Sequence, residues 1–118
     1  MTQITGKATV RVDGEELLSE VGATLNVGGV EREAQLGPRG VQGYKENPVA
    51  PSIQVTVQHT GETDIVQLAG ITAASVLFET DTGVTYLMRE AFVTEPPELD
   101  ASAGTFALNF SGMGLERV

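Results

Sequence analysis

The stretch that decides the fold covers residues 27–60 and has the sequence VGGVEREAQLGPRGVQGYKENPVAPSIQVTVQHT. Its last part, residues 52–58, alternates apolar and polar side chains without a break, which predicts a half-buried β-strand. The apolar face holds Ile53, Val55 and Val57, and the polar face holds Gln54, Thr56 and Gln58. One face of this strand therefore belongs to a core, and the other is left for water or for another molecule.

The residues just before this strand are rich in glycine and proline. Proline lacks a backbone donor and glycine favours turns, so we expect residues 37–51 to form an irregular loop. A loop of that length in a small domain is usually functional or disordered. Val41, Tyr44 and Val49 give it apolar surface to bury, which favours function. With the preceding extended residues it forms a protruding arm at about residues 30–51.

Length and composition place the chain among single soluble domains. A chain of 118 residues supports one hydrophobic core, so we expect a single domain over residues 1–118. The formal charge of −9 argues against a protein that grips nucleic acid through its phosphates. The chain has no cysteine, which excludes disulfides and thiolate metal sites. We also expect no targeting peptide, membrane span or membrane binding.

The remaining sequence predicts a mostly β fold, a β-sandwich or barrel of about seven strands. Alternation marks strands near residues 7–12, 22–27, 75–80, 84–94 and 105–111, and Asp13-Gly14 predicts a hairpin turn. Residues 62–70 change to a helical period, with Ile65, Leu68 and Ala69 on one face. We expect one short flanking α-helix there, packed on the sheet. The tail at residues 112–118 is expected to be loose.

The sequence offers no convincing catalytic, metal or cofactor site. His59 is the only histidine and lacks a nearby nucleophile motif, so we interpret it as a structural turn residue. Asp81 lies in a short turn that does not match a calcium loop. The glycine-rich stretches lack the lysine and helix of a phosphate cradle. We expect a protein that is not an enzyme and holds no cofactor or metal.

Several long runs resemble one family. The runs are GGVERE at residues 28–33, RGVQGYKENPVAPSIQVTVQHT at 39–60 and FETDTGVTYLMREAFVTEPPELD at 78–100. In order and spacing they resemble the tail tube protein of Mu-like contractile bacteriophages, over about residues 6–112. The resemblance implies a structural virion protein that is assembled in the host cytoplasm. It would stack as hexameric rings into the inner tail tube, with adjacent sheets joined in a continuous inner barrel.

The resemblance also implies partners and surfaces. The expected partners are other copies of the chain and the sheath, baseplate and tape-measure proteins. Phage DNA would pass through without specific binding. The loop becomes the candidate contact with a neighbouring subunit or ring, with Tyr44 and Val49 as anchors and Arg39 paired to an acidic residue. The full predicted interface is Arg39, Val41, Tyr44, Lys45 and Val49.

The polar faces of two predicted strands are almost uncharged, and we expect them to line the tube. A wall without cations gives passing phosphates nothing to hold, and net acidity adds repulsion. The predicted lumen residues are Gln54, Thr56, Gln58, Thr105, Asn109 and Ser111.

Two other readings stay open at this point. A type VI secretion tube resembles phage tubes in fold and would carry effectors in place of DNA. An independent β-sandwich that binds a glycan or peptide is a different class. It would be expected to show exposed aromatics, and this chain has no Trp, two Tyr and four Phe.

Overall fold

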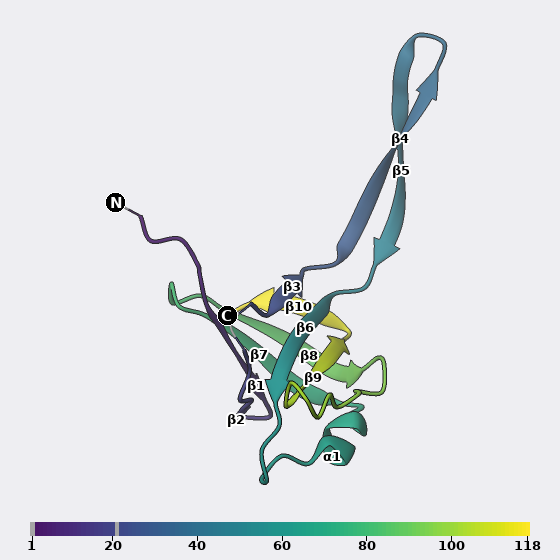
Figure 1. Ribbon diagram of the computed structural model, residues 1–118. Helices are drawn as coiled ribbons and strands as arrows, with labels where there is room; N and C mark the ends of the chain where they lie inside the picture. Colours follow the sequence, from purple (N-terminus) through teal and green to yellow (C-terminus); the bar gives the residue numbers. More distant parts are fainter. Residues whose placement is uncertain (1, 21) are drawn as a thin grey trace.

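Strand β6 (Ser52–Gln58) is the centre of the core in the computed structural model, which describes residues 2–20 and 22–118 (Figure 1). The alternation predicted for this stretch is confirmed, since Ile53, Val55 and Val57 are buried. The other elements are β1 (Ala8–Val12), β2 (Glu15–Glu16), β3 (Thr24–Asn26), β4 (Gly29–Gly37), β5 (Gly40–Val49), α1 (Ile65–Ala69), β7 (Ala74–Thr80), β8 (Thr85–Val93), β9 (Thr105–Ser111) and β10 (Gly114–Arg117). The predicted mostly β fold with one short helix is confirmed.

The first half of the core comes from the antiparallel pair β6–β9. Each buried residue of β6 lies directly opposite a buried residue of β9, so the two strands present one continuous apolar face. The opposed pairs are Ile53 with Phe110, Val55 with Leu108, and Val57 with Phe106. Burying six such side chains supplies much of the hydrophobic stabilisation of a domain of this size.

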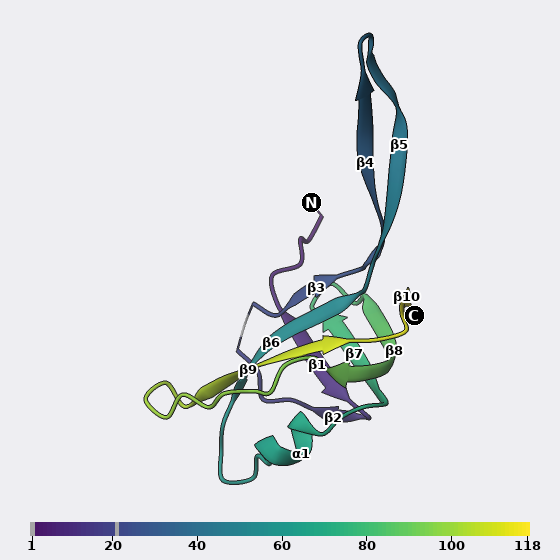
Figure 2. The same cartoon turned by 90° about the vertical axis from the view of Figure 1, so that its right-hand side faces the viewer.

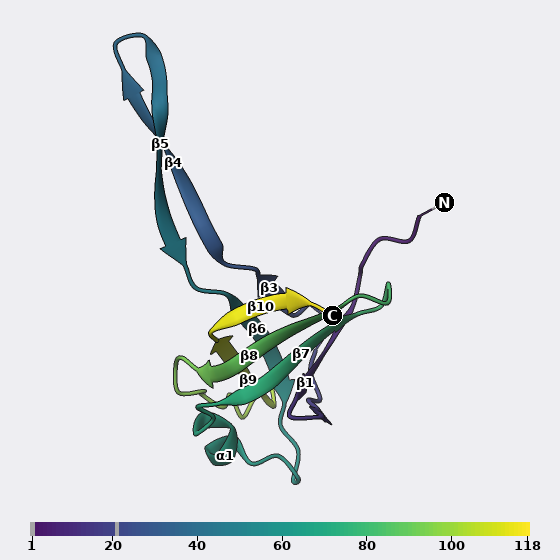
Figure 3. The ribbon, with the colours of Figure 1, turned by 180° about the vertical axis from the view of Figure 1, so that it is seen from behind.

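The second half of the core comes from β1, β7 and β8. They lie behind β6 and β9 in Figure 2, and β7 and β8 are in front in the view of Figure 3. The hydrogen-bonded order is β2-β1-β7-β8-β9-β6-β3, and β10 also pairs with β8. Strand β8 joins the two layers, because it pairs with β7 and β10 and then with β9 through Phe92 and Val93. The ladder is irregular just before this change of partner, where Glu90 has a φ of 48°. A bulge of this kind lets a sheet turn onto itself.

The helix α1 is shorter than residues 62–70 and covers one end of the core. Its N-cap is Asp64, whose Oδ1 accepts hydrogen bonds from the backbone N–H groups of Val66 and Gln67, both at 3.1 Å. Ile65 and Leu68 pack against the core as expected, whereas Ala69 is exposed. No helix in the described ranges is long and apolar enough to cross a membrane.

Three other expectations are wrong. Residues 37–51 do not form an irregular loop, because β4 and β5 make a long antiparallel hairpin through most of them. The C-terminal residues are not loose, since β10 pairs with β8 and the Arg89 guanidinium forms an ion pair with Glu116. The apolar phase of the strand predicted at residues 22–27 also placed Val27 on the core side, but its side chain is exposed.

The core makes a direct prediction about stability. We expect Leu108→Ala to lower the free energy of unfolding of the isolated chain by about 3 kcal/mol, because it leaves a cavity beside Val55. The matched control is Leu36→Ala on the hairpin, where the side chain is 75% exposed and the expected change is within about 0.5 kcal/mol. Urea unfolding measures both, and equal losses would contradict this assignment of the core.

Candidate assembly surfaces

The hairpin of β4 and β5, called the arm below, projects away from the body of the domain (Figure 1). The domain is correspondingly elongated, with extents of 62 × 40 × 28 Å. The two strands pair from Gly29 with Val49 at the root to Gly37 with Gly40 at the tip. None of the side chains of the arm is fully buried. A structured arm that buries so little against its own domain is available to contact another molecule.

The arm has two chemically different faces. Residues directly opposite in an antiparallel ladder share a face, and successive residues alternate. The register therefore puts on one face Val30, Ala34, Leu36, Val41, Tyr44 and Pro48, with Arg32 and Glu46 between them. It puts on the other face Glu31, Glu33, Gln35, Lys45 and Asn47. We call the first the apolar face of the arm and the second its polar face.

The structure distributes the predicted interface residues over the arm. Val41 and Tyr44 lie on the apolar face, with exposed fractions of 69% and 63%. Arg39 is in the turn at the tip, and Lys45 lies opposite Glu33 on the polar face. Val49 is at the root and half-buried. The five residues therefore do not form one patch, and one contact on the apolar face would include Val41 and Tyr44 but not Lys45.

Sequence reasoning missed the β4 side of the apolar face. Val30 and Leu36 are exposed there, and Arg32 lies with its guanidinium carbon 5.8 Å from the centre of the Tyr44 ring. This cation–π contact holds the tyrosine in position on the face. The sequence does contain the pattern of a strand here, because every second residue from 30 to 36 is apolar, small or basic. The charged residues between them made that alternation hard to see.

The root of the arm is fixed by close backbone packing. Gly28 has a φ of 66° and its N–H donates to Asn26 Oδ1 at 2.9 Å. A Cβ at Gly28 would lie 2.5 Å from the backbone nitrogen of Pro51. The Ser111 hydroxyl in turn donates to the Pro51 carbonyl oxygen at 2.9 Å. The direction of the arm is therefore set by contacts that only glycine at position 28 permits.

A second candidate surface is the outer face of β3, β6 and β9. The predicted polar residues meet there, because Gln54 lies opposite Asn109 and Gln58 lies opposite Thr105. Thr56 shares the same outward side and lies opposite Ala107. This surface, called the neutral face below, is visible toward the viewer in Figure 2. The structure thus brings together two stretches that are far apart in the sequence.

One predicted residue does not contribute to the neutral face, and other residues do. Ser111 is only 7% exposed, because its hydroxyl is used at the root of the arm. The expectation of an accessible hydroxyl there is therefore wrong. Thr24 lies opposite Gln54 and Asn26 lies opposite Ser52, which extends the neutral face by one strand. The sequence could have indicated both residues, because they are the polar positions of the strand predicted at residues 22–27.

His59 and Asp100, two titratable residues, both make local contacts that stabilise the fold. The described residues contain no group of three or more His, Asp or Glu side chains that could hold a metal ion. His59 lies edge-on to Phe106, with ring centroids 6.3 Å apart. Asp100 accepts hydrogen bonds from the Ser102 hydroxyl and from the backbone N–H groups of Ser102 and Ala103, which lower its pKa. That arrangement stabilises a turn and brings no second reactive group.

Comparison with known sequences identifies a family. The phage tail tube protein family matches residues 1–117. The Mu-like prophage FluMu tail tube protein of Haemophilus influenzae is 39% identical over 117 residues, which cover 99% of this chain and 98% of that protein. The tail tube protein of Escherichia phage Mu is 32% identical over 98 residues, covering 83% of this chain and 82% of that protein.

Comparison with solved structures supports the fold. The tube-terminating cap of the anti-feeding prophage matches with a TM-score of 0.68 and 12% identity, covering 100% of this chain and 91% of that one. A chain of the sheath/tube terminator of an extracellular contractile injection system matches with a TM-score of 0.65 and 14% identity, covering 95% and 93%. At these identities the likeness concerns the fold alone.

The root of the arm yields a testable prediction. We expect Gly28→Ala to lower the free energy of unfolding by about 2 kcal/mol, through left-handed strain and the clash with Pro51. The control is Gly29→Ala, where φ is also positive but no atom lies within 4 Å of an added Cβ. Urea unfolding compares the two variants. An equal cost would show that the close approach to Pro51 contributes nothing.

Proposed function

The chain belongs to the phage tail tube protein family, and from this premise we propose how it builds a tube. Copies assemble into rings of six, and the rings stack into the inner tube of a contractile tail. Its role is structural, as a component of the virion. The proposed ring and its stacking follow the physics of a head-to-tail contact, which either closes into a ring or grows as a filament.

The observation that carries this proposal is the uncovered apolar face of the arm. Leu36, Val41 and Tyr44 are each more than 60% exposed on one side of a projecting hairpin. Large exposed apolar patches usually mark an interaction site, and a two-stranded hairpin alone is only marginally stable in water. A neighbouring copy that covers this face would stabilise the arm and the assembly together. Sheet edges of adjacent copies would also be hidden in a continuous barrel.

The neutral face supports a conduit role. The residues assigned to the lumen are Gln54, Thr56, Gln58, Thr105 and Asn109, joined by Thr24 and Asn26. None of them carries a charge, so a phosphate backbone passing along them would meet no cation that could hold it. The chain as a whole has a formal charge of −9, which adds repulsion around the channel. DNA would therefore slide through without specific binding.

The proposal includes further partners and a place of assembly. We infer contacts with sheath, baseplate and tape-measure proteins, assembly in the host cytoplasm, and no membrane binding. We also infer that the protein is not an enzyme. A structural tube requires no catalysed reaction. His59 packs edge-on to Phe106, and Asp100 accepts a hydrogen bond from the Ser102 hydroxyl.

The sequence relatives favour a phage over a secretion system. Both curated relatives are tail tube proteins, one of phage Mu and one of a Mu-like prophage. Three solved structures that match are only 12–14% identical, so they show the fold alone and do not separate the two kinds of tube. An independent ligand-binding β-sandwich is disfavoured by membership of the family.

The apolar face of the arm gives the first functional prediction. Tyr44→Ala is expected to raise the protein concentration needed for tube assembly at least about tenfold, since truncating a central interface aromatic commonly costs more than ~1.4 kcal/mol. Sedimentation and electron microscopy of the purified protein measure the assembled fraction. Tyr44→Phe should assemble like the original protein, as should Gln35→Ala on the polar face. Normal assembly by Tyr44→Ala would remove the arm from the contact.

The neutral face gives the second functional prediction. In phage particles, lysines at Gln54 and Thr56 should slow DNA ejection, because each ring would then present cations to passing phosphates. The control places lysines at Ala101 and Ala103, two exposed positions of the turn before β9. DNA release is followed by fluorescence in both kinds of particle. An unchanged rate with lysines at Gln54 and Thr56, in tails of normal length, would place this face away from the channel.

A further inference from the structure

The tip of the arm combines two exposed apolar side chains with one cation. Leu36 and Val41 lie directly opposite each other there, with exposed fractions of 75% and 69%. Arg39 projects from the turn between the two strands and has no ion pair among residues 2–20 and 22–118. Among the residues that the structure describes, none buries Leu36 and Val41 and none forms an ion pair with Arg39.

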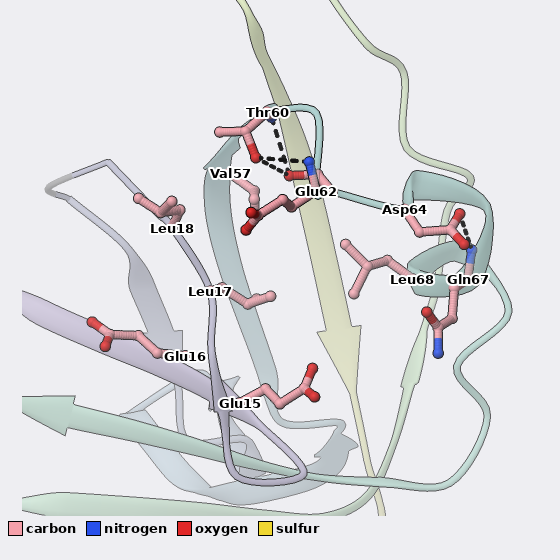
Figure 4. Close-up of a pocket in the computed structure, with 11 residues that line it drawn as sticks. Glu15, Glu16, Leu17, Leu18, Val57, Thr60, Glu62, Asp64, Gln67 and Leu68 are labelled. Atoms are coloured by element: carbon pink, nitrogen blue, oxygen red, sulfur yellow. Dashed lines mark hydrogen bonds between the residues drawn. The ribbon is translucent and has the colours of Figure 1, made fainter.

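At the other end of the domain is a pocket of about 370 Å³ beside α1 (Figure 4). Leu17 and Leu68 point toward one another across it, and both are half-buried against the core. Glu15 and Glu62 stand beside this apolar centre, whereas Glu16 lines the pocket with its side chain pointing away from the two leucines (Figure 4). No lysine or arginine lines the pocket in the described part of the chain.

The three glutamates are free to accept a partner. Asp64, which also lines the pocket, uses its carboxylate to cap α1. The carboxylates of Glu15, Glu16 and Glu62, by contrast, make neither an ion pair nor a hydrogen bond with any residue that the structure describes. The like charges of Glu15 and Glu62 beside one hollow repel each other, and a guanidinium would relieve that repulsion while forming paired hydrogen bonds.

The distribution of charge between arm and body is also complementary. The arm carries three basic and three acidic side chains, which cancel. The other four basic and thirteen acidic side chains therefore carry the whole formal charge of −9. Two bodies repel each other, so a neutral arm with a cationic tip is the element that can approach a second body at least cost.

We propose that the tip of the arm of one copy inserts into the pocket beside α1 of a second copy in the next ring. Leu36 and Val41 enter between Leu17 and Leu68, and the Arg39 guanidinium binds the glutamates at the rim. The tip of the arm and α1 lie at opposite ends of the molecule (Figures 1 and 2), and the pocket is lined by α1 residues such as Leu68. Such a head-to-tail contact repeats from ring to ring and so sets the growth direction of a tube. This inference rests on the proposed tube function.

Charge reversal tests the contact. Arg39→Glu and Glu62→Arg should each reduce the amount of long tubes at least about tenfold, because each places like charges together. The double variant Arg39→Glu/Glu62→Arg should recover most of the loss. Both positions are exposed, so circular dichroism should show an unchanged fold. The matched control Arg117→Glu, on exposed β10, should form tubes as the original protein does. Equal tube length in all variants, or no recovery in the double variant, would overturn the proposal.

A cross-link tests the geometry directly, since the chain contains no cysteine of its own. In tubes of the double variant Arg39→Cys/Glu62→Cys, oxidation should give a ladder of disulfide-linked multimers on a non-reducing gel. The control pair Lys45→Cys/Glu62→Cys, farther down the arm and on its polar face, should give none. If tubes form but the ladder is absent, the arm docks elsewhere and the tube function stands. If the original protein forms no tubes at all, the proposed function itself fails.

Discussion

The structure depends on one constraint: a two-stranded arm cannot bury its own apolar face. The body of the domain solves the same problem internally, because β6 and β9 face β1, β7 and β8. The arm has no second layer. It is held by its ladder, by the Arg32–Tyr44 contact and by the contacts at its root, where Gly28 packs against Pro51 and donates a hydrogen bond to Asn26. In the proposed tube, a neighbouring copy would supply the missing layer without any additional component.

The same domain separates three tasks on three surfaces. The core fixes the positions of β6 and β9, and their outward side presents uncharged polar groups that suit a channel. The arm exposes apolar area that we propose as the contact between copies, and it carries no net charge. The body carries the whole net negative charge, and charge of one sign makes bodies repel one another. In the proposed assembly, association would therefore be restricted to the places where apolar surface and a counter-charge coincide.

The sequence predicted what depends on short-range patterns and missed what depends on distant pairing. Alternation identified β6 with its buried residues and the position of β9, and it led to the prediction that their polar sides share a role. The arm was expected to be irregular because proline and glycine were taken as breakers. In fact Pro48 lies in a hairpin made only of edge strands, where proline is tolerated, and Pro38 lies in the turn. Strand β10 and the burial of Ser111 arise from long-range partners that no local pattern encodes.

Hydrogen–deuterium exchange of the arm measures the central claim most directly. In dilute, unassembled protein, the amides of β4 and β5 should exchange far faster than those of β6 and β9, because little buries the arm. On assembly the arm amides should become at least about a hundredfold more protected, while the core amides change little. Arm amides as protected as the core in the dilute protein, or still unprotected in the assembled one, would contradict the account.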